Sequence, residues 1–177
     1  MGKIINFTCY TIGKSKSYQM NKAYLIIILL LMLVLPSMSV GIDYSISTIH
    51  VSLIPLIGKW FIFWSIGVRL FSAGIRQVSK PAFTAETIFH ITNEDSFVIV
   101  KELGFANICL GLIGIISLFI PDWRMASAFA GGLFMGIAGI NHIIKKPEGI
   151  NELIAMVSDI FIAIVMISVI VFHTFHW

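Results

Sequence analysis

Five long apolar stretches, separated by short polar segments, dominate the pattern of positions along the chain. A helix that crosses a bilayer needs about 20 predominantly apolar residues, and each stretch has that length. We expect transmembrane helices at residues 23–42, 56–77, 97–120, 125–144 and 151–172. The predicted fold class is an all-α integral membrane bundle, with the last four helices as its core and the first packed outside. Residues 23–177 would form one transmembrane domain behind a tail at residues 1–22.

The first apolar stretch has two interpretations. Three lysines precede it, and the small residues from Ser37 to Ser39 resemble a cleavage site, which together describe a signal peptide ending near residue 39. We favour a retained helix, because the apolar run continues to Val40 and is longer than a typical signal sequence. We expect Pro36 to kink this helix, which membrane helices tolerate when neighbours satisfy the freed carbonyl.

The composition agrees with a membrane protein and excludes other classes. The chain has 177 residues, of which 58% are apolar and 12% charged, whereas a soluble domain has about 25% charged residues. Disordered chains need low hydrophobicity, and two cysteines are too few for a disulfide scaffold. We expect the lipid bilayer as the main partner, a membrane protein or a second copy of the chain as further candidates, and no nucleic acid.

The cations predict the orientation of the helices. With the N-terminus in the cytoplasm, nine of the 12 lysines and arginines lie on the inner side, as the positive-inside rule requires. These nine are Lys3, Lys14, Lys16, Lys22, Arg76, Lys80, Lys101, Lys145 and Lys146. Lys59 and Arg124 would lie outside. We therefore expect a multi-pass protein of the cell (inner) membrane, with a cytoplasmic N-terminus and an external C-terminus.

Several polar side chains fall within the predicted helices, all towards their inner ends. Arg69 and Asp159 would lie roughly 10–12 Å deep, at 1.5 Å of rise per residue. The candidate polar site comprises Arg69, Glu102, Asn107, His142, Glu152 and Asp159. Secondary candidates are Gln77, Glu86, Asn151 and Ser158. A charge inside the membrane costs about 3 kcal/mol even on the lenient insertion scale, so each is expected to face the bundle interior with a partner.

Two interpretations of this polar cluster stay open. In one, Arg69 forms a structural ion pair with Asp159 or Glu152 that locks the bundle. In the other, the cluster lines a cavity on the cytoplasmic side that binds a small molecule or relays protons. His142 by itself is more typical of a helix end than of a ligand. We predict no metal site, because the pair His173 and His176 is weak support for one.

Three smaller features complete the pattern. Small residues in the third and fourth helices favour close helix packing, with room for a ligand as the alternative. A short helix from Ala85 to His90, capped by Thr84, would rest on the membrane surface in the loop that follows the second helix. The aromatic residues of the segment 60–64, namely Trp60, Phe61, Phe63 and Trp64, are typical of an interfacial belt.

The segments GKWFIFWSIGVRLFSAGIRQ, PAFTAETIF, KELGFAN, AGGLFMGIAGINH and NELIAMVSDIF carry a family resemblance. They resemble an uncharacterised family of small prokaryotic membrane proteins, which is similar in size and helix layout to DoxX-like proteins. The resemblance implies the helical fold and a polar site, and carries no established activity. Some DoxX-like proteins are associated with quinone-linked sulfur oxidation, so a quinone is the one cofactor that it suggests.

We expect a non-enzymatic protein that binds a small molecule or lipid, or that assists a membrane partner, because no catalytic constellation is recognisable. The first alternative is a quinone-associated oxidoreductase subunit. The second is a small transporter or proton-coupled carrier.

Overall fold

Apolar helices account for nearly all of the computed structural model, which describes residues 20–47 and 52–175. Five helices are long and apolar enough to cross a membrane, at Lys22–Ile46, Leu53–Ser79, Ser96–Ile116, Trp123–Lys145 and Ile150–Phe175. No strand occurs within the described ranges. The predicted all-α membrane bundle is confirmed, while most of the expected tail, Cys9 and His176 lie outside the described residues.

Two of the five helices contain a stretch of π-helix, in which the backbone hydrogen bonds span five residues. The first consists of α1 (Lys22–Leu29), η1 (Leu30–Val34) and α2 (Leu35–Ile46), and the second of α3 (Leu53–Phe61), η2 (Ile62–Val68) and α4 (Arg69–Ser79). The remaining three are α5 (Ser96–Ile116), α6 (Trp123–Lys145) and α7 (Ile150–Phe175). The η1 stretch ends directly before the segment with Pro36, so a widened turn accompanies that proline, which lacks an N–H.

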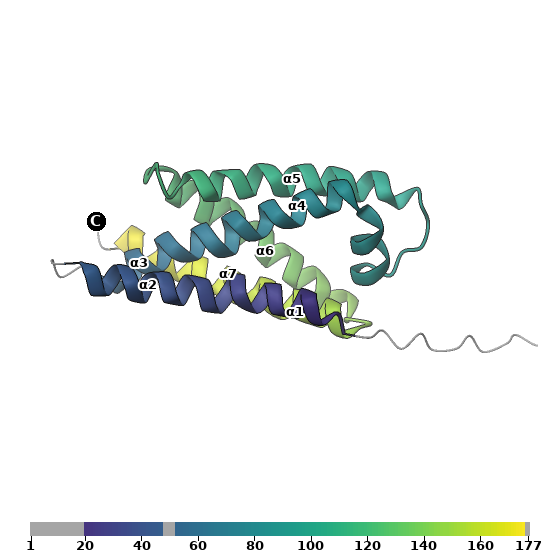
Figure 1. Cartoon of the computed structure of the whole chain (residues 1–177), viewed down its shortest axis with the longest axis horizontal. Helices are drawn as coiled ribbons and strands as arrows, with labels where there is room; N and C mark the ends of the chain where they lie inside the picture. Colours follow the sequence, from purple (N-terminus) through teal and green to yellow (C-terminus); the bar gives the residue numbers. More distant parts are fainter. Residues whose placement is uncertain (1–19, 48–51, 176–177) are drawn as a thin grey trace, which may run out of the picture.

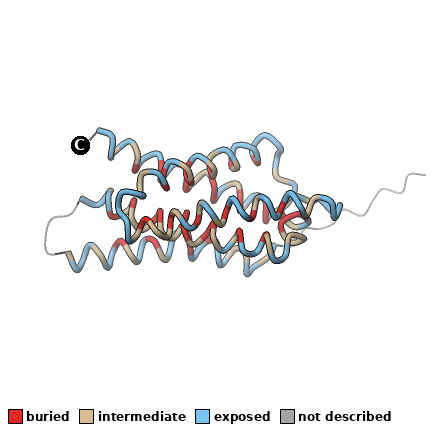
Figure 2. Tube along the Cα trace, turned by 90° about the horizontal axis from the view of Figure 1, so that it is seen from above, coloured by how far each residue is buried: buried red, intermediate tan, exposed pale blue. Residues whose placement is uncertain are grey.

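The helices alternate in direction, so their ends gather at two ends of the bundle. One end, called here the basic end, holds the cations Lys22, Arg76, Lys80, Lys101 and Lys145. Helix α1 begins at the basic end, and α7 finishes at the opposite end (Figure 1). Buried positions lie on the faces between helices, and exposed positions cover the outer faces (Figure 2). Side chains such as Ile99 and Ile144, each 73% exposed, are placed to contact lipid.

Four of the five long helices share one apolar core. Its buried members are Ile28, Met32, Phe61, Ile62, Ile66, Leu70, Ala128, Met135, Ile162 and Met166. The first helix contributes Ile28 and Met32, so it packs into this core as well as along its edge. Phe61 is only 8% exposed, and its predicted place in an interfacial belt is therefore wrong. Trp60 and Trp64 instead donate hydrogen bonds to Asp43 and Ser39 of the first helix.

Helix α5 packs on the second long helix through backbone, because glycines face each other there. A Cβ on Gly74 would lie 2.5 Å from the carbonyl oxygen of Gly104, and one on Gly114 would lie 2.7 Å from Cα of Gly67. Such approaches leave no room for a side chain and give membrane helices the close contact that substitutes for hydrophobic drive. The small residues of the third predicted helix thus serve packing, and their partners are glycines of the second.

One predicted boundary and one predicted element differ from the structure. Helix α5 ends at Ile116 rather than residue 120, because the chain turns at Ser117, whose hydroxyl bonds the carbonyl of Gly114. The predicted surface helix from 85 to 90 is a π-helical turn, η3 (Phe83–Ile88). Thr84 lies inside η3 and does not cap it. Because Thr84 and Ile88 are buried, η3 packs into the bundle and does not rest on a surface.

Candidate functional site

Arg69 opens α4 directly after the π-helical stretch η2, and its side chain reaches across the bundle to α7. Its Nη2 donates to Asp159 Oδ1 at 2.7 Å and to Ser158 Oγ at 2.8 Å. Arg69 and Asp159 are 8% and 7% exposed, so the charges neutralise each other away from water. Nη1 lies 3.5 Å from the sulfur of Met135. Of the two anions expected for Arg69, the structure pairs it with Asp159.

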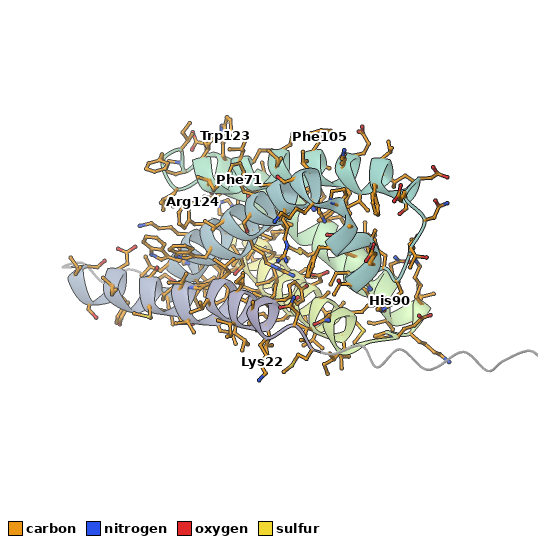
Figure 3. All side chains as sticks on the ribbon, turned by 45° about the vertical axis from the view of Figure 1, so that its right-hand side comes forward. Lys22, Phe71, His90, Phe105, Trp123 and Arg124 are labelled. Atoms are coloured by element: carbon orange, nitrogen blue, oxygen red, sulfur yellow. The ribbon has the colours of Figure 1, made fainter. Side chains whose placement is uncertain are left out.

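Glu152 belongs to a second polar group, made with two histidines. Its Oε1 lies 2.9 Å from Nδ1 of His142 on α6, and its Oε2 lies 3.6 Å from Nε2 of His90. The backbone N–H of Glu148 also donates to Oε2 at 3.0 Å. This group ties the end of α6 and the start of α7 to His90, which follows η3. Figure 3 shows His90 at the basic end, far from Trp123 and Arg124.

Gln77 and Asn107 form the third polar group, between α4 and α5. Asn107 Nδ2 donates to Gln77 Oε1 at 2.7 Å, and both side chains are buried. Asn107 Oδ1 is buried and has no hydrogen-bond partner among the described residues. An unsatisfied buried acceptor costs about 1–3 kcal/mol, so a donor from outside the protein would gain by bonding it.

These groups surround one cavity at the basic end, with a volume of about 580 Å³. Arg69, Gln77, Asn107, His142 and Asp159 all line it. Most of the remaining wall is apolar, and includes Ile28, Leu31, Leu70, Phe134 and Met135. The volume lies within the range of roughly 300–1,000 Å³ that is typical of ligand sites. A mostly apolar wall with few polar groups is also typical of such sites.

Three of the predicted site residues lie apart from these polar groups. Glu102 and Glu86 are exposed, and neither lines the cavity. Glu102 is five residues before the buried Asn107, which turns it about 140° around the helix axis at 3.6 residues per turn. Membership of Glu102 in one converging cluster is therefore wrong. Asn151 is buried and accepts a hydrogen bond from the backbone of Asn21 at 2.9 Å, which joins α7 to the start of α1.

Sequence reasoning missed several residues of the cavity wall. Tyr24 and Phe83 line it and contact each other, with ring centroids 6.2 Å apart. Thr84 lines it from inside η3. A tyrosine at the basic end of an otherwise aliphatic helix was a usable signal, since its hydroxyl prefers a polar partner. Phe134 lies within an apolar stretch of α6, residues 128–140, and offered no such signal.

A second cavity of about 600 Å³ lies at the opposite end, and none of the predicted site residues lines it. Its cation Lys59 bonds Asp43 at 2.7 Å, and its other charges, Arg124 and Asp122, are of opposite sign. The cavity at the basic end differs because it joins three buried polar groups and an unpartnered acceptor. We take it as the candidate site.

Comparison with known proteins identifies a family without an assigned activity. The model of that family matches residues 22–176, which include all five long helices, and its description is "Family of unknown function (DUF6790)". No curated protein and no solved structure matches the chain.

Proposed function

We propose that this chain, which belongs to the DUF6790 family of unknown function, binds a small amphipathic molecule or lipid within the membrane. The cavity at the basic end is the proposed binding site. One observation carries the proposal: an apolar cavity of about 580 Å³ is lined by Asn107, whose buried Oδ1 lacks a hydrogen-bond partner in the described part of the protein. A ligand with an apolar body and a polar head would satisfy both features.

Binding without catalysis is the form of the proposal that the polar contacts favour. Arg69 is bonded to Asp159, and His142 to Glu152. Side chains held in such pairs give a rigid wall of fixed polarity, whereas general acid–base catalysis needs a group free to reach the reacting atom. The positive-inside rule would place the basic end, and with it the cavity, on the cytoplasmic side of the cell membrane. An accessory role towards a membrane partner or a second copy stays a prediction.

A quinone is the second candidate ligand, and the aromatic wall favours it. Tyr24, Phe83, Phe89 and Phe134 line the cavity, and aromatic side chains stack well on a planar ring. In that case the protein would act as a subunit of a quinone-associated oxidoreductase. A transporter, the other alternative, predicts solute or proton flux in liposomes that Asp159→Asn abolishes.

The experiment is native mass spectrometry of the protein released gently from its membrane, with a cavity-filling variant and a matched control. Ala138 lines the cavity on α6, and Ala126 is an exposed alanine of the same helix. We expect a stoichiometric adduct on the wild type and on Ala126→Phe, and its loss in Ala138→Phe. The adduct's mass and absorbance separate a lipid from a quinone. Identical adducts on all three proteins would remove the cavity as the binding site.

A further inference from the structure

Arg76 stands at the rim of the cavity and is held there by an aromatic ring. It lies three residues before the end of α4, and its side chain lines the cavity although the residue is exposed. The guanidinium carbon is 3.6 Å from the ring centroid of Phe83 in η3. Stacking on a ring engages one face of the guanidinium and leaves the N–H groups at its edge available to an anion.

The charges that line the cavity do not cancel at this rim. Deeper in the cavity, Arg69 is neutralised by Asp159 at 2.7 Å. No ion pair involves Arg76 within the described ranges 20–47 and 52–175. The lining therefore keeps one positive charge, at the point where the cavity meets the end of the bundle. Basic pockets between membrane helices are typical binding sites for anionic lipid headgroups.

The unpartnered acceptor belongs to Asn107 on α5, which also lines the cavity. Gln77 follows Arg76 in the chain and accepts the amide hydrogen bond of Asn107. Asn107 Oδ1 then remains as a buried acceptor. An anion alone would satisfy Arg76 and would leave this oxygen unpaired. A headgroup with both an anionic oxygen and a hydroxyl or amide donor would satisfy both sites.

We propose that the ligand is a membrane-resident amphiphile whose anionic headgroup also carries a hydrogen-bond donor. The anion would bind Arg76, the donor would bind Asn107 Oδ1, and the hydrocarbon would lie along the apolar wall. Ile27 and Ile137, which line the cavity and are 45% and 59% exposed, join that wall to the lipid-facing surface. This inference rests on the proposed function, because it names the class of ligand for the same cavity.

The test compares four probes that share an oleoyl chain, titrated against the detergent-solubilised full chain by native mass spectrometry. Methyl oleate has neither charge nor donor, oleate has the charge, monooleoylglycerol has donors, and oleoyl-lysophosphatidylglycerol has both. We expect the last to bind about tenfold more tightly than oleate or monooleoylglycerol, since hydrogen bonds to charged or buried groups are worth that much. Methyl oleate is expected to bind weakest.

Variants assign each preference to its residue. Arg76→Gln is expected to remove the preference of oleate over methyl oleate, and Arg76→Lys to keep most of it. Lys80→Gln, an exposed cation next to α4 that does not line the cavity, is the matched control and should change nothing. Gln77→Leu combined with Asn107→Leu is expected to remove the preference of monooleoylglycerol over methyl oleate, because it deletes both polar partners together.

The outcomes separate this inference from the function beneath it. If Ala138→Phe displaces all four probes but the wild type does not distinguish them, the cavity binds ligand and the proposed headgroup is wrong. An unchanged oleate preference in Arg76→Gln also overturns the assignment to Arg76. If Ala138→Phe displaces no probe, the proposed function fails and this inference fails with it.

Discussion

Arg69 Nη2 lies 2.7 Å from Asp159 Oδ1. The two residues are 90 positions apart in the chain, and their contact joins α4 to α7. The pair lies farther from the basic end than Arg76 does, because Arg69 begins α4 and Arg76 lies near its end. Removing one partner would leave the other charge buried and unpaired. The two interpretations of the pair, as a structural lock and as part of a binding site, make different predictions.

The first prediction concerns substitutions of this pair. Arg69→Met or Asp159→Leu alone should lower the free energy of unfolding by about 3–5 kcal/mol, whereas the double variant should lie much closer to the wild type. Thermal unfolding in detergent, followed by circular dichroism, measures this coupling. If the pair also serves binding, the folded double variant should lose its bound adduct in native mass spectrometry. A folded double variant that keeps the adduct would show that the pair stabilises the bundle and does not serve binding.

The depth of polar residues within the predicted helices identified part of the site. The errors come from the direction in which each side chain points around its helix axis. Arg69 and Asp159 have similar distances from the basic ends of their helices, and the sequence indicated Asp159 or Glu152 as the partner of Arg69. Depth also suggested Glu102, but the glycine contacts of α5 with α4 turn Asn107 inward and Glu102 outward. The spans were predictable because apolar length is a local property of the chain. The contact of His90 with Glu152 was not, because it depends on how η3 folds back.

The second prediction concerns the packing of the second long helix on α5, at Gly67 in η2. Gly67→Ala should destabilise the protein by about 1–3 kcal/mol, because the added Cβ would lie 2.8 Å from the backbone nitrogen of Ile115 and neither backbone can move away easily. Gly41→Ala is the matched control, since nothing lies within 4 Å of its Cβ. Alanine favours helix by up to about 1 kcal/mol over glycine, so the control should be neutral or stabilised. Thermal unfolding midpoints of the two variants should therefore move apart.

The third prediction concerns Glu152 and the stability of the η3 segment. Glu152→Leu should release residues 83–91, because it removes the group that holds His90 and His142 together. Glu152→Gln keeps an oxygen that accepts hydrogen bonds and should release them less. Hydrogen exchange of the segment, read by mass spectrometry, gives the comparison. Glu148→Gln, at an exposed residue of the same connection, is the control, and equal protection in all variants would contradict the role of Glu152.

The fourth prediction concerns orientation. Reporter proteins fused after the last residue, one active only in the cytoplasm and one active only outside, should show activity from the external reporter. The physical reason is the concentration of cations at the basic end, which the positive-inside rule places in the cytoplasm. Helix α7 finishes at the end opposite to the start of α1 (Figure 1), so the last residue reports on the far side. A fusion after Lys146, in the connection between α6 and α7, should give the reverse pattern.

The last prediction concerns the first helix and its alternative interpretation as a cleaved signal peptide. Cleavage near residue 39 would remove Ile28 and Met32 from the shared core and Tyr24 and Leu31 from the cavity wall. It would also remove the N–H of Asn21 that donates to Asn151. The loss of these contacts would open the cavity on one side. We therefore expect the mature protein to retain the helix. Intact mass spectrometry after expression in its membrane measures this directly, and a mass lower by the first 39 residues would establish cleavage.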